Sequence, residues 1–209
     1  MKIGILAVQG AFAEHQAMLN RLGYESVLLR QKSDIKSIDG LILPGGESTV
    51  QGKLLHELGM HNSIRELILA DIPTLATCAG LILLAQEISN DTHTYLATMP
   101  ITVKRNAYGR QLASFRTYEL FGTENPIGTD NPIGPDNSIG TENSIGPQKI
   151  PMTFIRAPYI ETTASDVTTL AVVENHIVAA KYRKQIGLSF HPELDDDTTV
   201  HEMFLDLLH

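Results

Sequence analysis

The chain of 209 residues is long enough for one domain with a substantial core, and 43% hydrophobic with 19% charged residues exclude a wholly disordered chain. A net charge of −8 without any run of basic residues argues against a nucleic-acid-binding protein. One cysteine excludes an internal disulfide, no apolar stretch reaches the about 18 residues of a membrane span, and the first residues lack a signal-peptide pattern, so we expect a soluble cytoplasmic protein.

The first hundred residues alternate between short apolar runs and longer amphipathic stretches. The runs predicted as strands are 2–8, 26–29, 40–43 and 73–77, and the stretches predicted as helices are 11–22 and 50–69. Apolar strands that alternate with helices form parallel sheets with both faces covered. We therefore expect a three-layer α/β fold with a mostly parallel central sheet, in which ligands bind at the carboxyl ends of the strands.

After residue 95 the pattern changes to shorter segments. Those that suit added or antiparallel strands are 101–104, 114–120, 153–155, 170–173 and 177–182. A last apolar stripe at helical spacing predicts a closing helix that contains Val200, Phe204, Leu205 and Leu208.

A repeat separates two of these segments. Residues 123–146 hold four copies of a six-residue unit, TENPIG, TDNPIG, PDNSIG and TENSIG. A period of six is typical of hexapeptide solenoids, but one isoleucine per unit makes a thin core. The Asn, Asp, Pro and Gly content favours successive turns or a flexible loop. We interpret about 123–147 as a low-complexity insertion in a single domain that spans residues 1–209.

The single cysteine, Cys78, follows the apolar run 73–77 and precedes Ala79 and Gly80. A nucleophile elbow has this pattern, because small flanking residues permit a sharp strand-to-helix turn and the helix N-terminus favours a thiolate. The alternative is a buried structural cysteine.

A cysteine nucleophile needs a base, usually a histidine held by an acid. His191 and Glu193 lie two residues apart, and in an extended segment such residues share a face, so Glu193 can fix the tautomer of the ring. The other seven histidines have no comparable acid partner at a strand end, and we interpret them as surface or packing residues: His15, His56, His61, His93, His176, His201 and His209.

The loop Pro44-Gly45-Gly46-Glu47-Ser48 follows the third strand. Paired glycines let backbone N–H groups approach a developing oxyanion, although a plain tight turn has the same composition. The loop lacks the glycine spacing and the lysine of a phosphate-binding P-loop. Because the histidines are scattered and the cysteine is alone, we expect no metal site and no cofactor.

Together, the cysteine elbow, the Gly-Gly loop and the distant His-Pro-Glu resemble the class I, triad-type glutamine amidotransferases, which have a flavodoxin-like α/β fold. Six segments are similar, in order and across nearly the whole chain, to the glutaminase subunits of pyridoxal 5'-phosphate synthase: 4–15, 41–49, 78–85, 105–111, 154–158 and 189–194.

This resemblance implies that Cys78 is the nucleophile, His191 the general base and Glu193 the acid that orients it. It implies that the glutamine and its oxyanion contact Gly45, Gly46, Glu47, Ser48, Arg105, Ile155 and Arg156. The implied enzyme is a glutaminase that forms a γ-glutamyl thioester and releases glutamate and ammonia. Its implied partner is the synthase subunit of a hetero-oligomer, which combines the ammonia with a pentose phosphate and a triose phosphate to make vitamin B6.

The chain departs from the family pattern at two places, the repeat and Ala76, where the family usually has glycine. The methyl group of Ala76 is tolerable at negative φ and costly if the turn requires positive φ. Three alternatives remain: a glutaminase of another pathway such as imidazole glycerol phosphate synthase, a non-catalytic assembly subunit, and a cysteine hydrolase or stress protein of similar fold. The segments 105–111 and 154–158 argue against the first.

Overall fold

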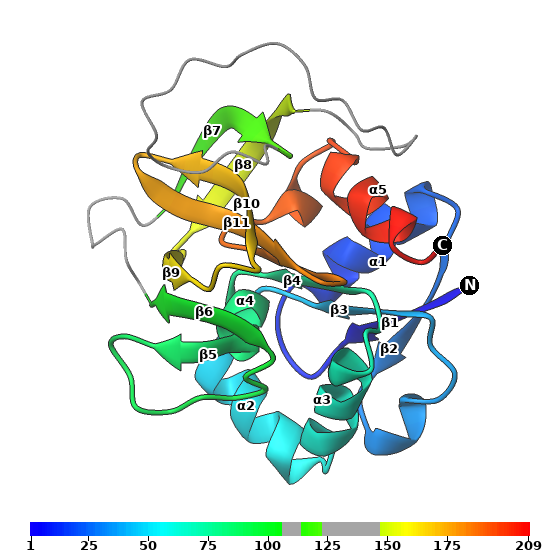
Figure 1. Cartoon of the computed structure of the whole chain (residues 1–209). Helices are drawn as coiled ribbons and strands as arrows, with labels where there is room; N and C mark the ends of the chain where they lie inside the picture. Colours follow the sequence, from blue (N-terminus) through cyan, green and yellow to red (C-terminus); the bar gives the residue numbers. More distant parts are fainter. Residues whose placement is uncertain (106–113, 123–146) are drawn as a thin grey trace.

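The computed structural model describes residues 1–105, 114–122 and 147–209, and within them a ten-stranded sheet forms the centre of the molecule (Figure 1). Its first half is parallel, in the order β2-β1-β3-β4-β12. These strands are β1 (Lys2–Leu6), β2 (Glu25–Leu29), β3 (Gly40–Leu43), β4 (Thr74–Thr77) and β12 (Gln185–Leu188). The parallel sheet expected from the apolar runs is confirmed.

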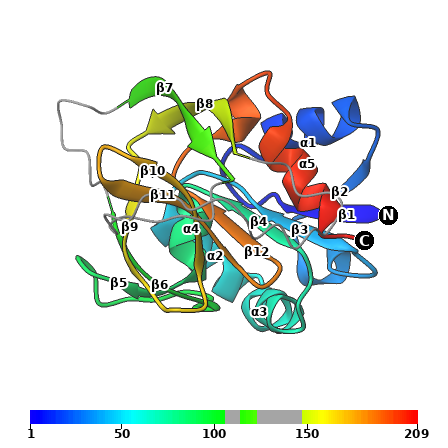
Figure 2. The same cartoon turned by 45° about the horizontal axis from the view of Figure 1, so that its top comes forward.

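Helices cover both faces of this parallel half (Figures 1 and 2). On one face lie α1 (Phe12–Arg21) and α5 (Thr199–Asp206), and on the other α2 (Ser48–Glu57), α3 (His61–Leu69) and α4 (Ala79–Leu84). Successive side chains of β3 point to opposite faces of the sheet, so both faces need a covering layer of helices. Ile42 packs in one core with Phe204 of α5, whereas Leu41 and Leu43 pack in the other core with helix α3. The predicted three layers are thus present.

The second half of the sheet is mainly antiparallel and consists of β11 (His176–Tyr182), β10 (Thr168–Val173), β9 (Tyr159–Thr163), β6 (Met99–Lys104) and β5 (Ala85–Ile88). The change of pattern after residue 95 anticipated such strands. Strands β5, β9 and β12 were not predicted. Two of these have only four residues, and β5 continues the apolar run of α4 without a turn signal.

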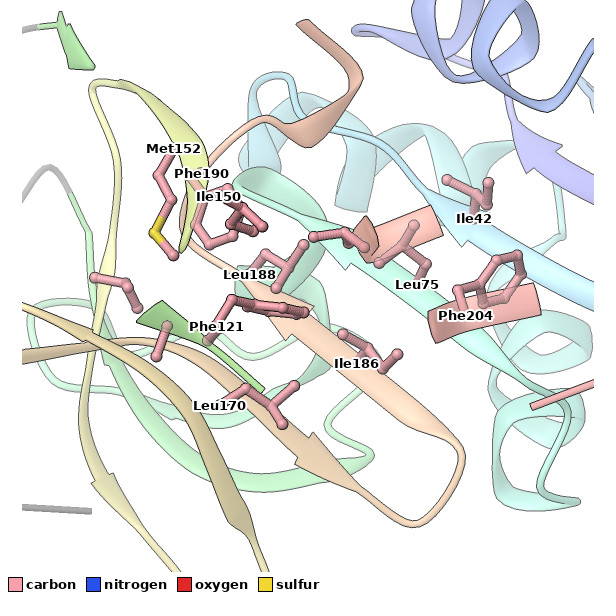
Figure 3. Packing of buried hydrophobic residues seen from close by; sticks show 14 of the residues in the cluster. Ile42, Leu75, Phe121, Ile150, Met152, Leu170, Ile186, Leu188, Phe190 and Phe204 are labelled. Atoms are coloured by element: carbon pink, nitrogen blue, oxygen red, sulfur yellow. The ribbon is translucent and has the colours of Figure 1, made fainter. Parts of the chain in front are cut away.

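A separate antiparallel pair, β7 (Ser114–Phe121) and β8 (Gln148–Ile155), packs on the face that carries α1 and α5. Phe121 and Met152 turn inward from the pair onto Leu188 and Phe190 near the end of β12 (Figure 3). This packing brings Ile155 to the carboxyl ends of the parallel strands.

The predicted single helix over 50–69 is wrong, because α2 and α3 are separated at Leu58–Met60. Gly59 has φ of +64°, and its N–H donates to the His56 carbonyl at 3.0 Å. A glycine in the left-handed region ends a helix at little cost, and here it ends α2 and lets α3 begin in a new direction. The two further helical turns are η1 (Lys32–Asp34) and η2 (Pro192–Leu194).

Ala76 lies inside β4, where it pairs in register with Leu43 and Gly187. Its backbone is therefore extended, and the positive φ of the elbow falls two residues later, at Cys78. The methyl group is buried in the core and strains nothing at the turn. The repeat at 123–146 and the residues 106–111 that follow Arg105 lie outside the described residues.

Candidate active site

Cys78 occupies a strained turn between β4 and α4. Its backbone has φ of 47° and ψ of −98°, and its N–H donates to the Leu188 carbonyl at 2.8 Å. Such a conformation costs a non-glycine residue about 1 to 3 kcal/mol, and it is typical of side chains that a turn holds at a reactive site. Cys78 is 6% exposed, and its sulfur lies 3.9 Å from the Ile155 carbonyl oxygen.

The strain at the elbow predicts that Cys78→Gly is more stable than Cys78→Ala, by about 1 kcal/mol in the free energy of unfolding. Glycine adopts positive φ freely, whereas alanine keeps the clash of its Cβ. Urea unfolding of both variants measures the difference. The control is Ala79→Gly in the first turn of α4, where the same change to glycine should destabilise the protein. A Cys78→Gly variant less stable than Cys78→Ala would contradict the strain.

His191 and Glu193 form a buried pair at the turn η2. His191 Nδ1 donates to Glu193 Oε1 at 2.7 Å, and the backbone N–H of His191 donates to the Thr153 carbonyl at 2.8 Å. The two residues meet as expected, although the extended segment assumed for them is wrong. A 3-10 turn instead folds the carboxylate back onto the ring.

The charges around His191 favour its protonated form. Burial lowers the pKa of the ring, but the hydrogen bonds to Cys78 and Glu193 outweigh it and raise the pKa to about 10. Burial likewise opposes the charge of Glu193, yet the proximity of His15, together with the hydrogen bond and the charge of His191, holds its pKa below the ordinary range. The geometry therefore places an imidazolium between a carboxylate and the cysteine sulfur, an arrangement that activates a thiol nucleophile.

The Gly45-Gly46 loop packs directly against this pair. Gly45 N–H donates to Thr77 Oγ1 at 2.9 Å, and Glu47 N–H donates to Gln9 Oε1 at 2.8 Å. A Cβ on Gly45 would overlap the His191 ring, so the close approach requires glycine. In the described part of the chain, the Gly46 N–H between these two donors makes no hydrogen bond.

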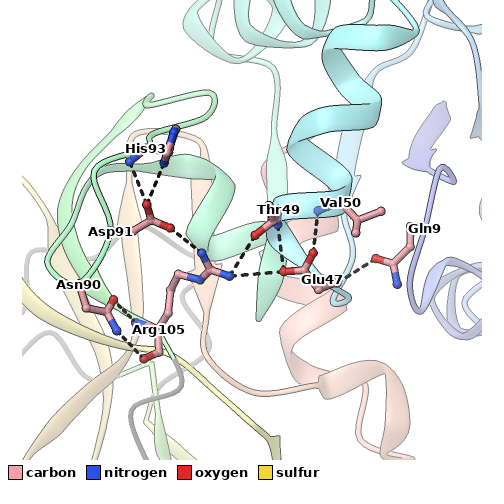
Figure 4. Close-up of polar contacts among 8 residues, drawn as sticks. All are labelled: Gln9, Glu47, Thr49, Val50, Asn90, Asp91, His93 and Arg105. Atoms are coloured by element: carbon pink, nitrogen blue, oxygen red, sulfur yellow. Dashed lines mark hydrogen bonds and ion pairs between the residues drawn. The ribbon is translucent and has the colours of Figure 1, made fainter.

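Arg105 is fixed by carboxylates on two sides (Figure 4). Its guanidinium donates to Asp91 Oδ2 at 2.7 Å and to Glu47 Oε1 at 3.3 Å. Hydrogen bonds from His93 together with Arg105 lower the pKa of Asp91 to about 2. Glu47 in turn accepts the Thr49 and Val50 N–H groups and so caps α2. Arg105 is thus held at the cavity wall in one orientation.

A cavity of about 450 Å³ opens above Cys78, and its size suits a small polar ligand. It is lined by Gln9, Gly46, Glu47, Ser48, Cys78, Ile82, Arg105, Ile155, Arg156 and His191. The structure thus brings together most of the residues singled out from the sequence. Gly45 and Glu193 lie behind His191 and support it. Gln9 and Ile82 were missed, although the position of Gln9 shortly after β1 satisfies the rule that ligands bind at strand ends.

His15 and His201 are both fully buried, as packing residues would be. The expectation of no acid partner is wrong for His15, whose Nε2 lies 3.4 Å from Glu193 Oε2, and for the exposed His93, whose Nδ1 lies 3.0 Å from Asp91 Oδ1. No local pattern could have shown the contact of His15 with Glu193, because the two residues come from opposite ends of the chain.

Residues 1–105, 114–122 and 147–209 contain neither a membrane-spanning helix nor a metal-binding cluster. The longest helices there have ten residues, and none is long and apolar enough to cross a membrane. In the same ranges, no group of three or more His, Cys, Asp or Glu side chains is arranged to hold a metal ion.

Comparison with known proteins gives consistent matches. The model of the SNO glutamine amidotransferase family matches residues 5–129 and 135–209. A curated protein named pyridoxal 5'-phosphate synthase subunit PdxT, from Desulfitobacterium hafniense, is 54% identical over 207 residues, which cover 99% of this chain and 92% of that protein. A protein of the same name from Streptococcus pneumoniae is 48% identical over 212 residues, covering 99% and 97%. A crystal structure of a glutamine amidotransferase, 33% identical, has a TM-score of 0.83 and covers 99% and 98%.

Proposed function

The chain belongs to the SNO glutamine amidotransferase family, and from this premise we propose that it hydrolyses L-glutamine to glutamate and ammonia in the cavity above Cys78. The observation that carries the proposal is the alignment of three groups: a thiol on a strained elbow, the His191 ring beside it, and Glu193 at 2.7 Å on the far side of that ring. These groups supply the nucleophile, the proton carrier and the acid that orients it.

The first half of the reaction breaks the amide bond. The Cys78 thiolate attacks the side-chain amide carbon of glutamine, and the carbonyl oxygen becomes an oxyanion. The Gly46 N–H is a suitable donor for that oxygen, because its neighbours at Gly45 and Glu47 are already bonded within the protein. His191 then gives its Nε2 proton to the leaving nitrogen, ammonia departs, and a γ-glutamyl thioester remains on Cys78.

The second half returns the enzyme to its starting state. Neutral His191 takes a proton from water, the hydroxide attacks the thioester carbon, and the sulfur leaves as thiolate beside the imidazolium that has re-formed. Glu193 remains ionised throughout, because its interactions with His191 and His15 hold its pKa low. Glutamate then leaves the cavity.

The charged residues around the cavity suit the amino-acid end of glutamine. Arg156 lines the cavity, is exposed, and forms no ion pair among the described residues, so its guanidinium is available for the α-carboxylate. Glu47 also lines the cavity and offers a carboxylate to the α-ammonium group. Arg105 is held by Asp91 and Glu47, and we assign it to fixing the Glu47 carboxylate and to the net charge of the site.

We propose that the ammonia passes to a pyridoxal 5'-phosphate synthase subunit in a hetero-oligomer. The support comes from two relatives at 54% and 48% identity that are named as subunits of that synthase. The same names argue against a glutaminase of another pathway. A non-catalytic assembly subunit is disfavoured because Ala76, the departure that could have disabled the elbow, lies in a regular strand.

The test measures glutamate release from glutamine by the chain alone and with a purified pyridoxal 5'-phosphate synthase partner subunit. We expect the rate to rise with the partner. We also expect that the mixture makes pyridoxal 5'-phosphate from glutamine only when this chain is present, whereas ammonium salts bypass the requirement. A folded chain without glutamate release in either condition would contradict the glutaminase. Glutamate release without any effect on the synthase would contradict the partner.

A further inference from the structure

Two histidines lie buried behind Glu193, outside the cavity. His15 comes from α1 and His201 from α5, and both are 0% exposed. Neither residue lines the cavity, so neither contacts the glutamine in the reaction steps proposed above. Fully buried imidazoles are costly unless their nitrogens are bonded, so their presence requires an explanation.

The His15 ring contacts both Glu193 and Thr77, two residues that support the site from behind. His15 Nε2 lies 3.4 Å from Glu193 Oε2 and 3.3 Å from Thr77 Oγ1. Thr77 directly precedes Cys78, and its Oγ1 accepts the Gly45 N–H at 2.9 Å. His15 therefore touches the acid of the pair and the residue that joins the elbow to the glycine loop. Its other nitrogen, Nδ1, lies 3.0 Å from His201 Nε2.

The positions of the N–H protons on His15 and His201 follow from whether each neighbouring group can donate or accept a hydrogen bond. Burial is the main influence on both rings and lowers the pKa of His15 and of His201, so both are neutral and each carries one N–H. Ionised Glu193 only accepts hydrogen bonds, so the favourable tautomer of His15 has its proton on Nε2. Its Nδ1 is then an acceptor and requires the proton of His201 on Nε2. The order His201, His15, Glu193, His191 is thus one continuous series of polar contacts.

We propose that His15 is a positioning residue for glutamine hydrolysis: it holds Oε2 of Glu193, so that Oε1 stays on His191 Nδ1. His201 in turn fixes the tautomer of His15. This inference rests on the proposed function. Oε2 is buried and forms no hydrogen bond of standard geometry among the described residues, and His15 Nε2, which is hydrogen-bonded to Thr77 Oγ1, lies 3.4 Å from it, close enough for its N–H to be shared between the two oxygens. Without that donor the buried carboxylate would rotate or take up a proton, because a desolvated charge with an unpaired oxygen is unstable.

The alternative is that His15 only fills space in the core. An apolar side chain of similar size would fill the same space but would donate no hydrogen bond. The two explanations therefore differ in what they predict for the protonation of Glu193 and His191. The titratable groups that interact with the His15 ring are Glu193, His191 and Glu14, and the His201 ring also interacts with Arg21. The variants compared below keep all of these groups except the histidine that is replaced, so a changed pH profile reports the loss of that histidine.

The test compares His15→Leu with His15→Gln, whose amide nitrogen reaches as far along the side chain as Nε2 and keeps a donor there. In complex with the synthase partner, His15→Leu should lower kcat roughly 10- to 100-fold, the usual cost of removing a group that orients a functional residue. KM should change little, because His15 does not reach the cavity. The acid limb of the kcat/KM profile should move to higher pH, since Glu193 becomes easier to protonate. His15→Gln should restore most of kcat.

NMR titration of the His191 ring gives a readout that does not depend on turnover. We expect its pKa to fall from about 10 in His15→Leu, because a less firmly held carboxylate stabilises the imidazolium less. The matched control is His56→Gln, an exposed histidine at the far end of α2, for which kcat and the titration should match the wild type. Should His15→Leu not fold, His201→Leu removes the donor to His15 Nδ1 and should shift the titration in the same direction.

Equal losses in His15→Leu and His15→Gln, with an unshifted pH profile and an unshifted His191 titration, would overturn the proposal and leave a packing role. Wild-type behaviour in both variants would overturn it as well. Absence of glutamate release by the wild type with its partner would instead contradict the proposed function, and the titration would still decide whether His15 positions the pair.

Discussion

Replacing Cys78 with alanine is expected to lower glutamine hydrolysis roughly ten-thousand-fold or more, because in the proposed mechanism the thiol forms the covalent intermediate, and among the described residues no other thiol lines the cavity. His191 and the Gly45-Gly46 loop remain in place in the variant, but without the thioester they assist only direct attack by water. Glutamate release with the synthase partner present measures the loss.

The same variant should still bind glutamine and still associate with the synthase, since the charged residues of the cavity are untouched. Binding measured by calorimetry is the control that separates lost chemistry from lost folding. Mass spectrometry should detect a γ-glutamyl adduct on the wild type and none on Cys78→Ala. Turnover in the variant within tenfold of the wild type would show that another group attacks the amide.

Replacing Glu193 with glutamine should lower kcat roughly a thousandfold or more, by analogy with the loss on neutralising the acid of a hydrolase triad. The amide can donate as well as accept, so His191 is no longer held with its Nδ1 proton toward residue 193 and its Nε2 toward Cys78. Loss of the negative charge also removes a stabilising partner of the imidazolium, and the pKa of His191 should fall from about 10. Steady-state kinetics and a ring titration measure the two effects.

Stability against pH gives an independent check on Glu193→Gln. The pKa of His191 is raised in the folded state from an ordinary 6.5 to about 10, so its contribution to stability is complete below pH 6.5 and is lost as the pH rises through about 10. The wild type should therefore exceed the variant most in free energy of unfolding just below pH 6.5, and the difference should shrink as the pH rises toward 10. A difference that grows over this window would contradict the protonated pair.

Much of the fold followed from apolar periodicity. Residues 40–43 and 73–77 were recognised as strands because they are continuous apolar runs, and the observed β3 and β4 match them to within one residue. The prediction of one continuous helix over 50–69 was wrong because the chain breaks at Gly59. Helical spacing persists on either side of the break, so the apolar pattern did not reveal it. Strands such as β9 have a half-polar pattern and become strands only through their neighbours.

Some residues of the candidate site were likewise predictable from the sequence, and others were not. Cys78 and the loop at Gly45 were predictable because in a parallel sheet all strand ends of one kind meet at one edge, so a local pattern determines a place in space. The support of Arg105 by Asp91 was not predictable, because the salt bridge depends on how the loop after β5 returns toward α2. Gln9 was missed for a similar reason, since its role comes from accepting the Glu47 N–H of another loop.

The residue pattern alone predicted the α/β class, the edge of the sheet at which the candidate site lies, and the pairing of a thiol with His191 and Glu193. These properties depend on periodicity and on short spacings, which are local. Two features came to light only in the packed fold: the positive φ falls at Cys78 rather than at Ala76, and His15 and His201 lie behind Glu193. Those contacts arise where α1 and α5 pack on one face of the sheet, and hydrophobic patterning specifies which faces meet without specifying which polar atoms then touch.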